Sequence, residues 1–293
     1  MSKSTTLLAS LKGTGKTTFL ASMSKSVPDT FAELLKQTKE GKIFDCSDVV
    51  SLQGETDGDL GALNAGMKMR VIDLTDSYFN WSEFSALMTK ELEKLRPDCV
   101  AGRIRAIGVD LGPASQALQS YASGNRTTLK SLTSNPDASF SADQNVWNAI
   151  SAQGFLFFNQ LRTMPCHIVG MAHLKVLDAG MRTNKASAAD IERNQLERQI
   201  RSASEGADYA YTPDLMKGIL APWNNHSSQI FIPRKANVNV GTAANPKWES
   251  RYYVQTAADD FAYAMCRAQS LVEPKETRTF NAILNQIEAL RSR

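Results

Sequence analysis

The chain has 293 residues, a formal net charge of +3, 42% hydrophobic and 22% charged residues, which is ordinary for a globular protein. No apolar run reaches the length of a membrane-spanning helix, and the N-terminus lacks a signal-peptide pattern, so we expect a cytoplasmic protein. The four cysteines are scattered without a C-x-x-C pair, which predicts reduced, buried thiols and argues against a zinc site. The net charge neither requires nor excludes nucleic acid as a partner.

The first predicted element is a buried parallel strand over residues 5–9, and a phosphate-binding loop follows it directly. The loop and the start of the next helix read Ser10, Leu11, Lys12, Gly13, Thr14, Gly15, Lys16, Thr17 and Thr18. This matches the nucleoside-triphosphate pattern G-x-x-x-x-G-K-[ST] except for its first glycine, which is replaced by Ser10. The alternative is a glycine-rich turn between a strand and a helix.

Each part of this loop has a physical task. Gly13 and Gly15 let the backbone curl so that consecutive N–H groups face an anion, which the start of the following helix also attracts. Lys16 is long enough to reach the β- and γ-phosphates, and the Thr17 hydroxyl suits Mg²⁺. The loop therefore predicts a site for ATP and Mg²⁺. Without a base-reading motif such as N-K-x-D, the choice between ATP and GTP stays open.

Three further strands and two helices follow in alternation. Apolar runs predict strands over residues 69–74, 104–111 and 166–173, and helical spacing of apolar residues predicts helices over 81–95 and 145–164. Pro97 and Pro165 are expected to end these helices. The alternation predicts an α/β fold with a mostly parallel sheet. The gap over residues 25–68 leaves the strand order open.

The rest of the chain predicts loops, added strands and a final helix. Polar composition predicts mobile loops over about 123–142 and 177–206, the second being a functional loop or a disordered insert. Residues 229–232 and 251–255 are expected to be short antiparallel strands at the sheet edge. An amphipathic helix is expected at the C-terminus, so that the predicted division is a domain over 1–275 and a helix over 276–293.

Asp110 closes the strand predicted over residues 104–111. An Asp at such a strand end holds the Mg²⁺ water shell opposite the loop threonine in P-loop enzymes, so Thr17 and Asp110 are the predicted metal ligands. The alternative is that Asp110 caps the helix that begins near Ala114.

Together the loop, the strand ending at Asp110, the helix over 144–164 and the strand over 165–173 resemble phage-encoded AAA-type, RecA-like P-loop ATPases. These are nucleotide-binding proteins grouped with single-strand-annealing recombinases. The resemblance covers residues 5 to about 177, thins through 213–218 and returns weakly over 253–267. It implies a RecA-like core with antiparallel C-terminal strands, ATP and Mg²⁺ as cofactors, and homo-oligomers. It also implies action on single-stranded DNA in phage recombination, annealing or replication, with other phage proteins of these processes as possible partners, in the host cytoplasm.

The resemblance also implies roles for individual residues. An acidic residue near the end of the second strand orients the attacking water in the family, and here Asp73 or Asp76 would fill that role in place of the usual Glu. His173 resembles the polar sensor that responds to the γ-phosphate. Arg267 fits the arginine that reaches a neighbouring subunit's nucleotide, while Met265 stands where a Lys is expected. Taken alone, each of these is equally an ordinary surface or structural residue.

The segment after the fourth predicted strand lies where RecA-like proteins place a loop that follows single-stranded DNA. Its basic candidates for phosphate contacts are Lys175, Arg182, Lys185, Arg193 and Arg198. The alternative is a solvated loop of mixed charge, because acidic residues offset the positive charge and no aromatic residue offers a stacking platform.

Two rival functions remain open at this point. A P-loop kinase for a small molecule or nucleotide would use clustered arginines as a lid, for which Arg193, Arg198 and Arg201 are candidates. A nucleotide-gated scaffold with little turnover would fit the missing Glu and Met265. No G-x-S-x-G elbow or G-x-G-x-x-G pattern supports acyl transfer or NAD binding.

Overall fold

The computed structural model describes residues 4–54, 59–74, 80–127, 144–176, 211–242, 245–258, 264–267, 273 and 275–291. Its strands are β1 (Thr5–Ser10), β2 (Phe44–Gln53), β3 (Met67–Asp73), β4 (Ala106–Asp110), β5 (His167–Val176), β6 (Tyr211–Pro213), β7 (Gln229–Asn239), β8 (Trp248–Gln255), β9 (Met265–Cys266) and β10 (Lys275–Glu276). Its helices are α1 (Lys16–Ala21), α2 (Phe31–Lys39), α3 (Leu60–Asn64), α4 (Trp81–Val100), α5 (Leu111–Thr127), α6 (Gln144–Arg162), α8 (Lys217–His226) and α9 (Phe280–Arg291).

The strands in this part of the chain form one sheet in the order β10-β8-β7-β1-β5-β4-β2-β3, with β6 beside β5 and β9 beside β7. All pairs from β7 to β3 are parallel, whereas β8, β6, β9 and β10 pair antiparallel. This confirms the predicted α/β fold with a mostly parallel sheet and antiparallel C-terminal strands. No helix within the described ranges is long and apolar enough to cross a membrane.

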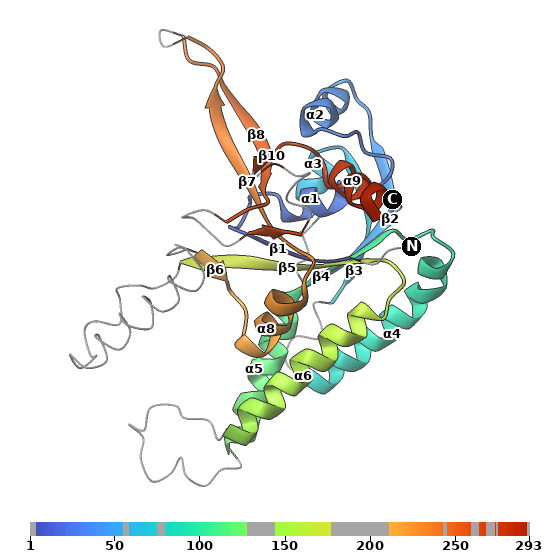
Figure 1. Ribbon diagram of the computed structural model, residues 1–293, viewed down its shortest axis with the longest axis vertical. Helices are drawn as coiled ribbons and strands as arrows, with labels where there is room; N and C mark the ends of the chain where they lie inside the picture. Colours follow the sequence, from blue (N-terminus) through green and yellow to red (C-terminus); the bar gives the residue numbers. More distant parts are fainter. Residues whose placement is uncertain are drawn as a thin grey trace, which may run out of the picture.

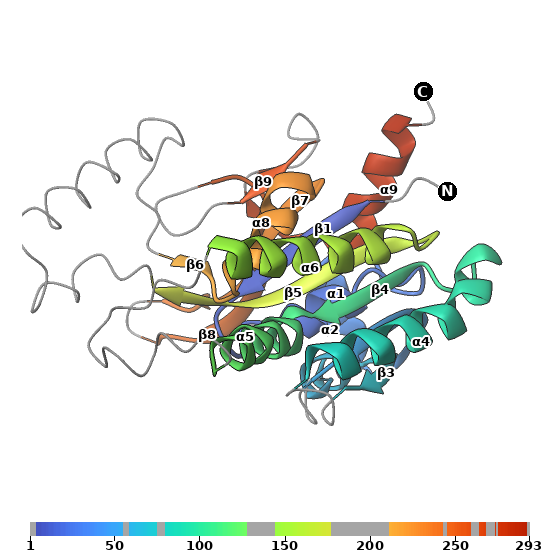
Figure 2. The ribbon, with the colours of Figure 1, turned by 90° about the horizontal axis from the view of Figure 1, so that it is seen from below.

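Helices cover both faces of the sheet (Figures 1 and 2). Side chains alternate along β1, so Leu7 packs with α4, α5, α6 and α8, while Leu8 packs with α1, α2 and α9 on the opposite face. The chain leaves β1 toward β2 through α1 and α2, and it returns from β3 to β4 and β5 through helices on the other face. Right-handed crossovers explain this arrangement. From β1 to β3 the chain moves across the sheet in one direction, and from β3 to β5 it moves back, so the helices of the two parts cover opposite faces.

The predicted elements mostly recur with small shifts. The four predicted core strands are β1, β3, β4 and β5, and the two predicted helices are α4 and α6. The expected stop at Pro97 is wrong, because α4 continues through it to Val100. Strand β2 was not predicted and lies in the gap over residues 25–68. Most of the two loops expected to be mobile lies outside the described residues.

The prediction for residues 229–232 needs a correction. Strand β7 runs parallel to β1, with Leu7 opposite Ile230, and lies inside the sheet instead of being an antiparallel edge addition. Strands β7 and β8 then extend well past the sheet as a two-stranded hairpin that projects from the body (Figure 1). Their pairing reaches Asn239 and Trp248, so both strands run well beyond the ranges of 229–232 and 251–255 that were expected.

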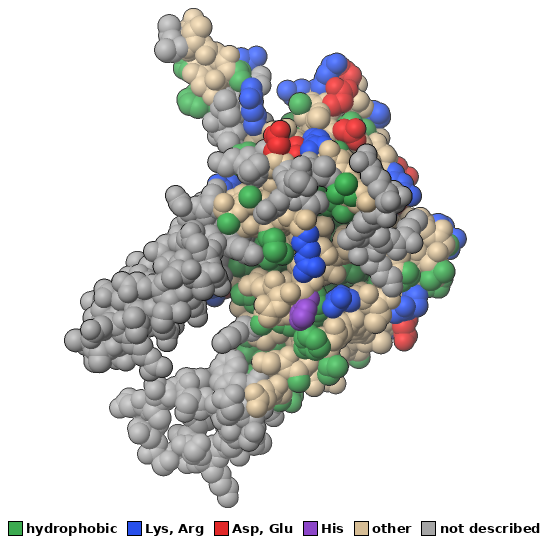
Figure 3. All heavy atoms as spheres, in the orientation of Figure 1, with side chains coloured by type: hydrophobic (Ala, Val, Ile, Leu, Met, Phe, Trp, Pro, Cys, Tyr) green, Lys and Arg blue, Asp and Glu red, His purple; other side chains and the backbone are tan. Residues whose placement is uncertain are grey.

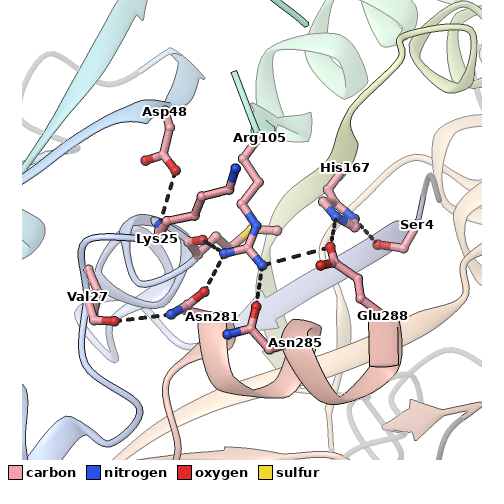
Figure 4. Close-up of polar contacts among 10 residues, drawn as sticks. Ser4, Lys25, Val27, Asp48, Arg105, His167, Asn281, Asn285 and Glu288 are labelled. Atoms are coloured by element: carbon pink, nitrogen blue, oxygen red, sulfur yellow. Dashed lines mark hydrogen bonds and ion pairs between the residues drawn. The ribbon is translucent and has the colours of Figure 1, made fainter. Parts of the chain in front are cut away.

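Helix α9 packs on α1 at the amino-terminal edge of the sheet, where the Phe280 and Phe19 rings stack with centroids 4.8 Å apart. The buried Arg105 guanidinium joins α9 to the turn that follows α1 (Figure 4). It donates to the Met23 carbonyl at 2.8 Å, to the Asn281 amide oxygen, and to the Asn285 amide oxygen at 2.9 Å.

His167, at the start of β5, extends this network (Figure 4). Its Nε2 lies 3.0 Å from the Glu288 carboxylate, and its Nδ1 lies 2.6 Å from the Ser4 hydroxyl. A neutral ring that donates through Nε2 accepts from Ser4 through Nδ1, so both contacts are satisfied together. The hydrogen bond from His167, aided by the Arg105 charge, lowers the pKa of Glu288.

Candidate nucleotide-binding site

The predicted phosphate loop is a tight curl between β1 and α1. Gly13 and Gly15 have φ of 77° and 99°, in the left-handed region that favours glycine. The Thr14 backbone N–H and hydroxyl both donate to the Leu11 carbonyl, at 3.3 and 2.7 Å, which closes the turn. Gly15 precedes the first residue of α1, and no side chain caps this helix.

Ser10, which replaces the first glycine of the pattern, is fully buried at the end of β1. Its hydroxyl lies 3.2 Å from the Leu11 carbonyl, so the small side chain folds back onto the loop's own backbone. A serine is therefore compatible with the curl at this position.

Lys16 and His173 meet at the mouth of the loop. Ser10 on β1 pairs with His173 on β5, and the Lys16 ammonium donates to His173 Nδ1 at 3.0 Å. An ammonium group has no acceptor, so the imidazole accepts through Nδ1 and carries its proton on Nε2. The structure thus joins the predicted phosphate-binding lysine and the predicted sensor.

This contact lies at the carboxyl ends of β1 and β5, where the connecting helices lie on opposite faces of the sheet. The helix that follows β1, α1, packs on one face of the sheet, whereas the next described helix after the neighbouring β5, α8, packs on the other face. In open α/β sheets, ligands bind at the carboxyl ends of the strands where the connections diverge in this way. The loop of residues 10–18 is therefore at the expected ligand position for the fold.

Asp110 ends β4, which is separated from β1 only by β5. Two strand spacings place its backbone about 10 Å from that of β1. One carboxylate oxygen accepts from the Gly112 N–H at 3.0 Å, as the helix-capping alternative expects for a residue directly before α5. Thr17 lies in the first turn of α1 and is half-buried.

Thr17 and Asp110 are suited to a magnesium ion that is also bound by nucleotide phosphates. They do not make a metal site formed by protein ligands alone. Within the described ranges, no group of three or more His, Cys, Asp or Glu could hold a metal ion. Magnesium in nucleotide sites is held by one or two protein oxygens together with substrate phosphates, and Thr17 and Asp110 offer a hydroxyl and a carboxylate.

Of the two predicted water-positioning carboxylates, only Asp73 lies within the described residues. Asp73 is exposed at the end of β3, the edge strand, four strand spacings and about 19 Å from β1. Asp76 lies outside the described residues.

Gln53 is a buried polar residue that the sequence patterns did not single out. It ends β2, directly beside the end of β4, where Leu52 pairs with Val109. Its side chain is 4% exposed and donates through Nε2 to the Ser51 hydroxyl at 2.8 Å, while Oε1 has no hydrogen-bond partner within the described part of the chain. The buried run Val49, Val50 and Leu52 was the available signal, but polar residues over 45–48 and a register irregularity obscured the strand.

Arg267 lies at the opposite edge of the sheet from the loop. It follows β9, whose Cys266 pairs with Gln229 at the beginning of β7, and its side chain is exposed. Met265 pairs with Ile230. Within one chain, Arg267 therefore lies away from the phosphate loop, at the amino-terminal end of β7.

Among the predicted DNA contacts, only Lys175 lies in the described part of the chain. Its ammonium forms an exposed ion pair with Asp214 at 2.8 Å. Arg182, Lys185, Arg193 and Arg198 lie outside the described residues, as does Arg201 of the kinase alternative.

Comparisons with known proteins add little to this geometry. No family model matches the chain, and no curated protein matches it. Among solved structures, a KaiC-like protein from the hyperthermophilic archaeon Pyrococcus horikoshii aligns with a TM-score of 0.31 and 11% identity, over 89% of this chain and 88% of that one. At such low similarity, the strand order and register given above remain the description of the fold.

Proposed function

We propose that this chain binds and hydrolyses ATP with Mg²⁺ as a RecA-like ATPase that acts on single-stranded DNA. The observation that carries the nucleotide part is the Lys16–His173 contact of 3.0 Å at the carboxyl ends of β1 and β5. A lysine held there by a neutral imidazole can exchange that partner for phosphate oxygens at small cost, because it remains hydrogen-bonded in both states.

Each residue then has a specific task. The backbone N–H groups around Gly13 and Gly15 face the phosphates, and Lys16 offsets their charge. Thr17 and Asp110 would hold Mg²⁺, which would stabilise the charge that develops on the phosphate oxygens. Gln53 orients the attacking water through its side-chain amide, and His173 changes its contact when the γ-phosphate arrives.

The role on DNA rests on the sequence resemblance to phage ATPases, which extends the proposal to phage recombination, annealing or replication. In that setting the protein is a homo-oligomer in which Arg267 faces the nucleotide of a neighbouring subunit. An arginine directed at the transferring phosphoryl group stabilises the transition state by a factor of ~10³ or more.

One observation favours a second candidate, a nucleotide-gated scaffold with little turnover. The buried side chain beside Asp110 is the amide of Gln53, and an amide cannot take a proton from water as a carboxylate does. Under this alternative, ATP binds and changes the conformation without being consumed rapidly.

A hydrolysis panel separates the candidates. ATP turnover is measured for the purified protein alone, with single-stranded DNA, and with small phosphate acceptors. The proposal predicts Mg²⁺-dependent turnover that DNA increases. Acceptor-dependent ADP release would instead support a kinase, and tight ATP binding without turnover would support the scaffold.

A further inference from the structure

The hairpin formed by β7 and β8 carries an unusual concentration of positive charge. Residues 229–255 contain four basic residues and one acidic residue, Glu249. Since the whole chain has 33 basic and 30 acidic residues, 29 of each remain elsewhere, and the entire net charge of +3 belongs to this hairpin. The basic residues are Arg234, Lys235, Lys247 and Arg251.

A large aromatic side chain stands at the end of the same hairpin. Trp248 is 65% exposed, whereas Trp81 and Trp223 are buried in the core. Lys247 and Arg251 beside it in sequence are also exposed, and basic side chains are visible along the projecting hairpin in Figure 3. An exposed tryptophan among cations is the combination by which proteins bind single strands, since the ring stacks on a base and the cations meet phosphates.

Hydrogen bonds join the two ends of the turn that carries these residues. The Asn239 side-chain oxygen accepts from the Gly241 and Lys247 N–H groups at 2.9 and 3.0 Å, and the Val240 N–H donates to the Lys247 carbonyl at 2.8 Å. Fixing Lys247 and Trp248 in this way lowers the entropy that binding would otherwise cost.

The pairing of β8 leaves an edge on which a nucleic acid strand fits. β10 pairs only with Val254 and Gln255, so the outer side of β8 from Trp248 to Tyr253 has no strand neighbour within the described ranges. Trp248 and Arg251 lie on opposite faces of the ribbon, three residues apart. A strand along this edge can therefore place a base on one face and a phosphate near the other.

We infer that the β7–β8 hairpin is a binding site for single-stranded nucleic acid, in which Trp248 stacks on a base and Lys247 and Arg251 contact phosphates. A single strand fits better than a duplex, because only unpaired bases expose a face to the ring. The inference rests on the proposed action on single strands, but it does not depend on ATP hydrolysis.

Binding of labelled oligodeoxythymidine and of its RNA counterpart, followed by fluorescence anisotropy, tests the inference, and the two arms identify the preferred sugar. Trp248→Ala should weaken binding about tenfold, since stacking on one base contributes that much or more. Trp248→Phe should stay within about threefold of the parent. The pair Lys247→Gln with Arg251→Gln should lower the slope of log affinity against log salt by about 1.4.

A matched charge control is available on α4 and the turn after it. Lys94→Gln with Arg103→Gln removes two exposed cations far from the hairpin and should leave the salt slope unchanged.

Parent-like affinity and salt slope in the hairpin variants would overturn the inference while leaving the proposed function intact. Failure of the parent protein to bind either oligonucleotide would overturn both. A change in oligomeric state on Trp248→Ala without nucleic acid would show a self-association surface instead and would also overturn it.

Discussion

Lys16 makes its contact with His173 across 157 residues of sequence, and this pair illustrates what local pattern can and cannot predict. The spacing of Gly13, Gly15 and Lys16 specifies a loop by itself, because glycine conformation and the reach of lysine are local properties. Gln53 belongs to no such pattern. Its position beside Asp110 arises from the strand order, which no short segment determines.

Gln53 gives a test at this scale. Gln53→Leu keeps the volume but removes the amide, so ATP hydrolysis should fall about 100-fold while ATP affinity changes by less than about threefold. Steady-state turnover and ATP titration measure the two effects. Gln286→Leu on α9 is the matched control, because its side-chain oxygen also has no partner in the described part of the chain but lies far from the loop. Equal turnover in the two variants would exclude Gln53 from the reaction.

At the scale of elements, β1, β4 and β5 were predictable because each is a short apolar run buried on both faces. β2 was not, since its first half alternates buried and exposed residues before a register irregularity. The place of α9 was also beyond the sequence. Its apolar face is evident, but its docking beside α1 includes hydrogen bonds from Arg105, which is buried directly before β4, to Asn281 and Asn285.

The α9 contacts predict a pH effect. The pKa of Glu288 is lowered from its ordinary value of 4.5, first by the hydrogen bond from His167 and then by the charge of Arg105. The ionised group therefore stabilises the fold above pH 4.5, and this contribution is lost as the pH falls through the lowered pKa. Glu288→Gln should make unfolding less dependent on pH in that acidic window, as urea titrations at several pH values would show. Exposed Glu93→Gln should keep the parent dependence, and an unchanged profile for Glu288→Gln would refute the link.

At the scale of the whole molecule, one strand connects the exposed hairpin to the phosphate loop. Tyr252 lies four residues from Trp248 along β8, about 13 Å, and on the same face. A Cβ placed on Gly15 would lie 3.7 Å from the Tyr252 ring, which also faces Phe31 with centroids 6.2 Å apart. Strand β8 therefore packs against the loop through Tyr252. Gly15 and Tyr252 are 237 positions apart, so the sequence alone did not reveal this arrangement.

This continuity predicts coupling between the two sites. Tyr252→Ala should reduce the ratio of DNA-stimulated to basal ATP hydrolysis several-fold, because the ring that contacts Gly15 is removed, while oligonucleotide affinity stays within about threefold. Tyr253→Ala, on the other face of β8, is the matched control and should keep the ratio. Equal stimulation in both variants would mean that the hairpin does not act through this contact.

The central claim is that the loop of residues 10–18 binds the triphosphate through Lys16. Calorimetric titration of Mg²⁺–ATP into the parent protein, Lys16→Ala and Lys12→Ala tests it most directly, since Lys12 is an exposed lysine of the same loop. The account predicts that Lys12→Ala binds within about threefold of the parent and Lys16→Ala at least about 100-fold more weakly, as expected for a lost charged contact to phosphate. Parent-like affinity in Lys16→Ala, or no binding by the parent at millimolar ATP, would contradict it.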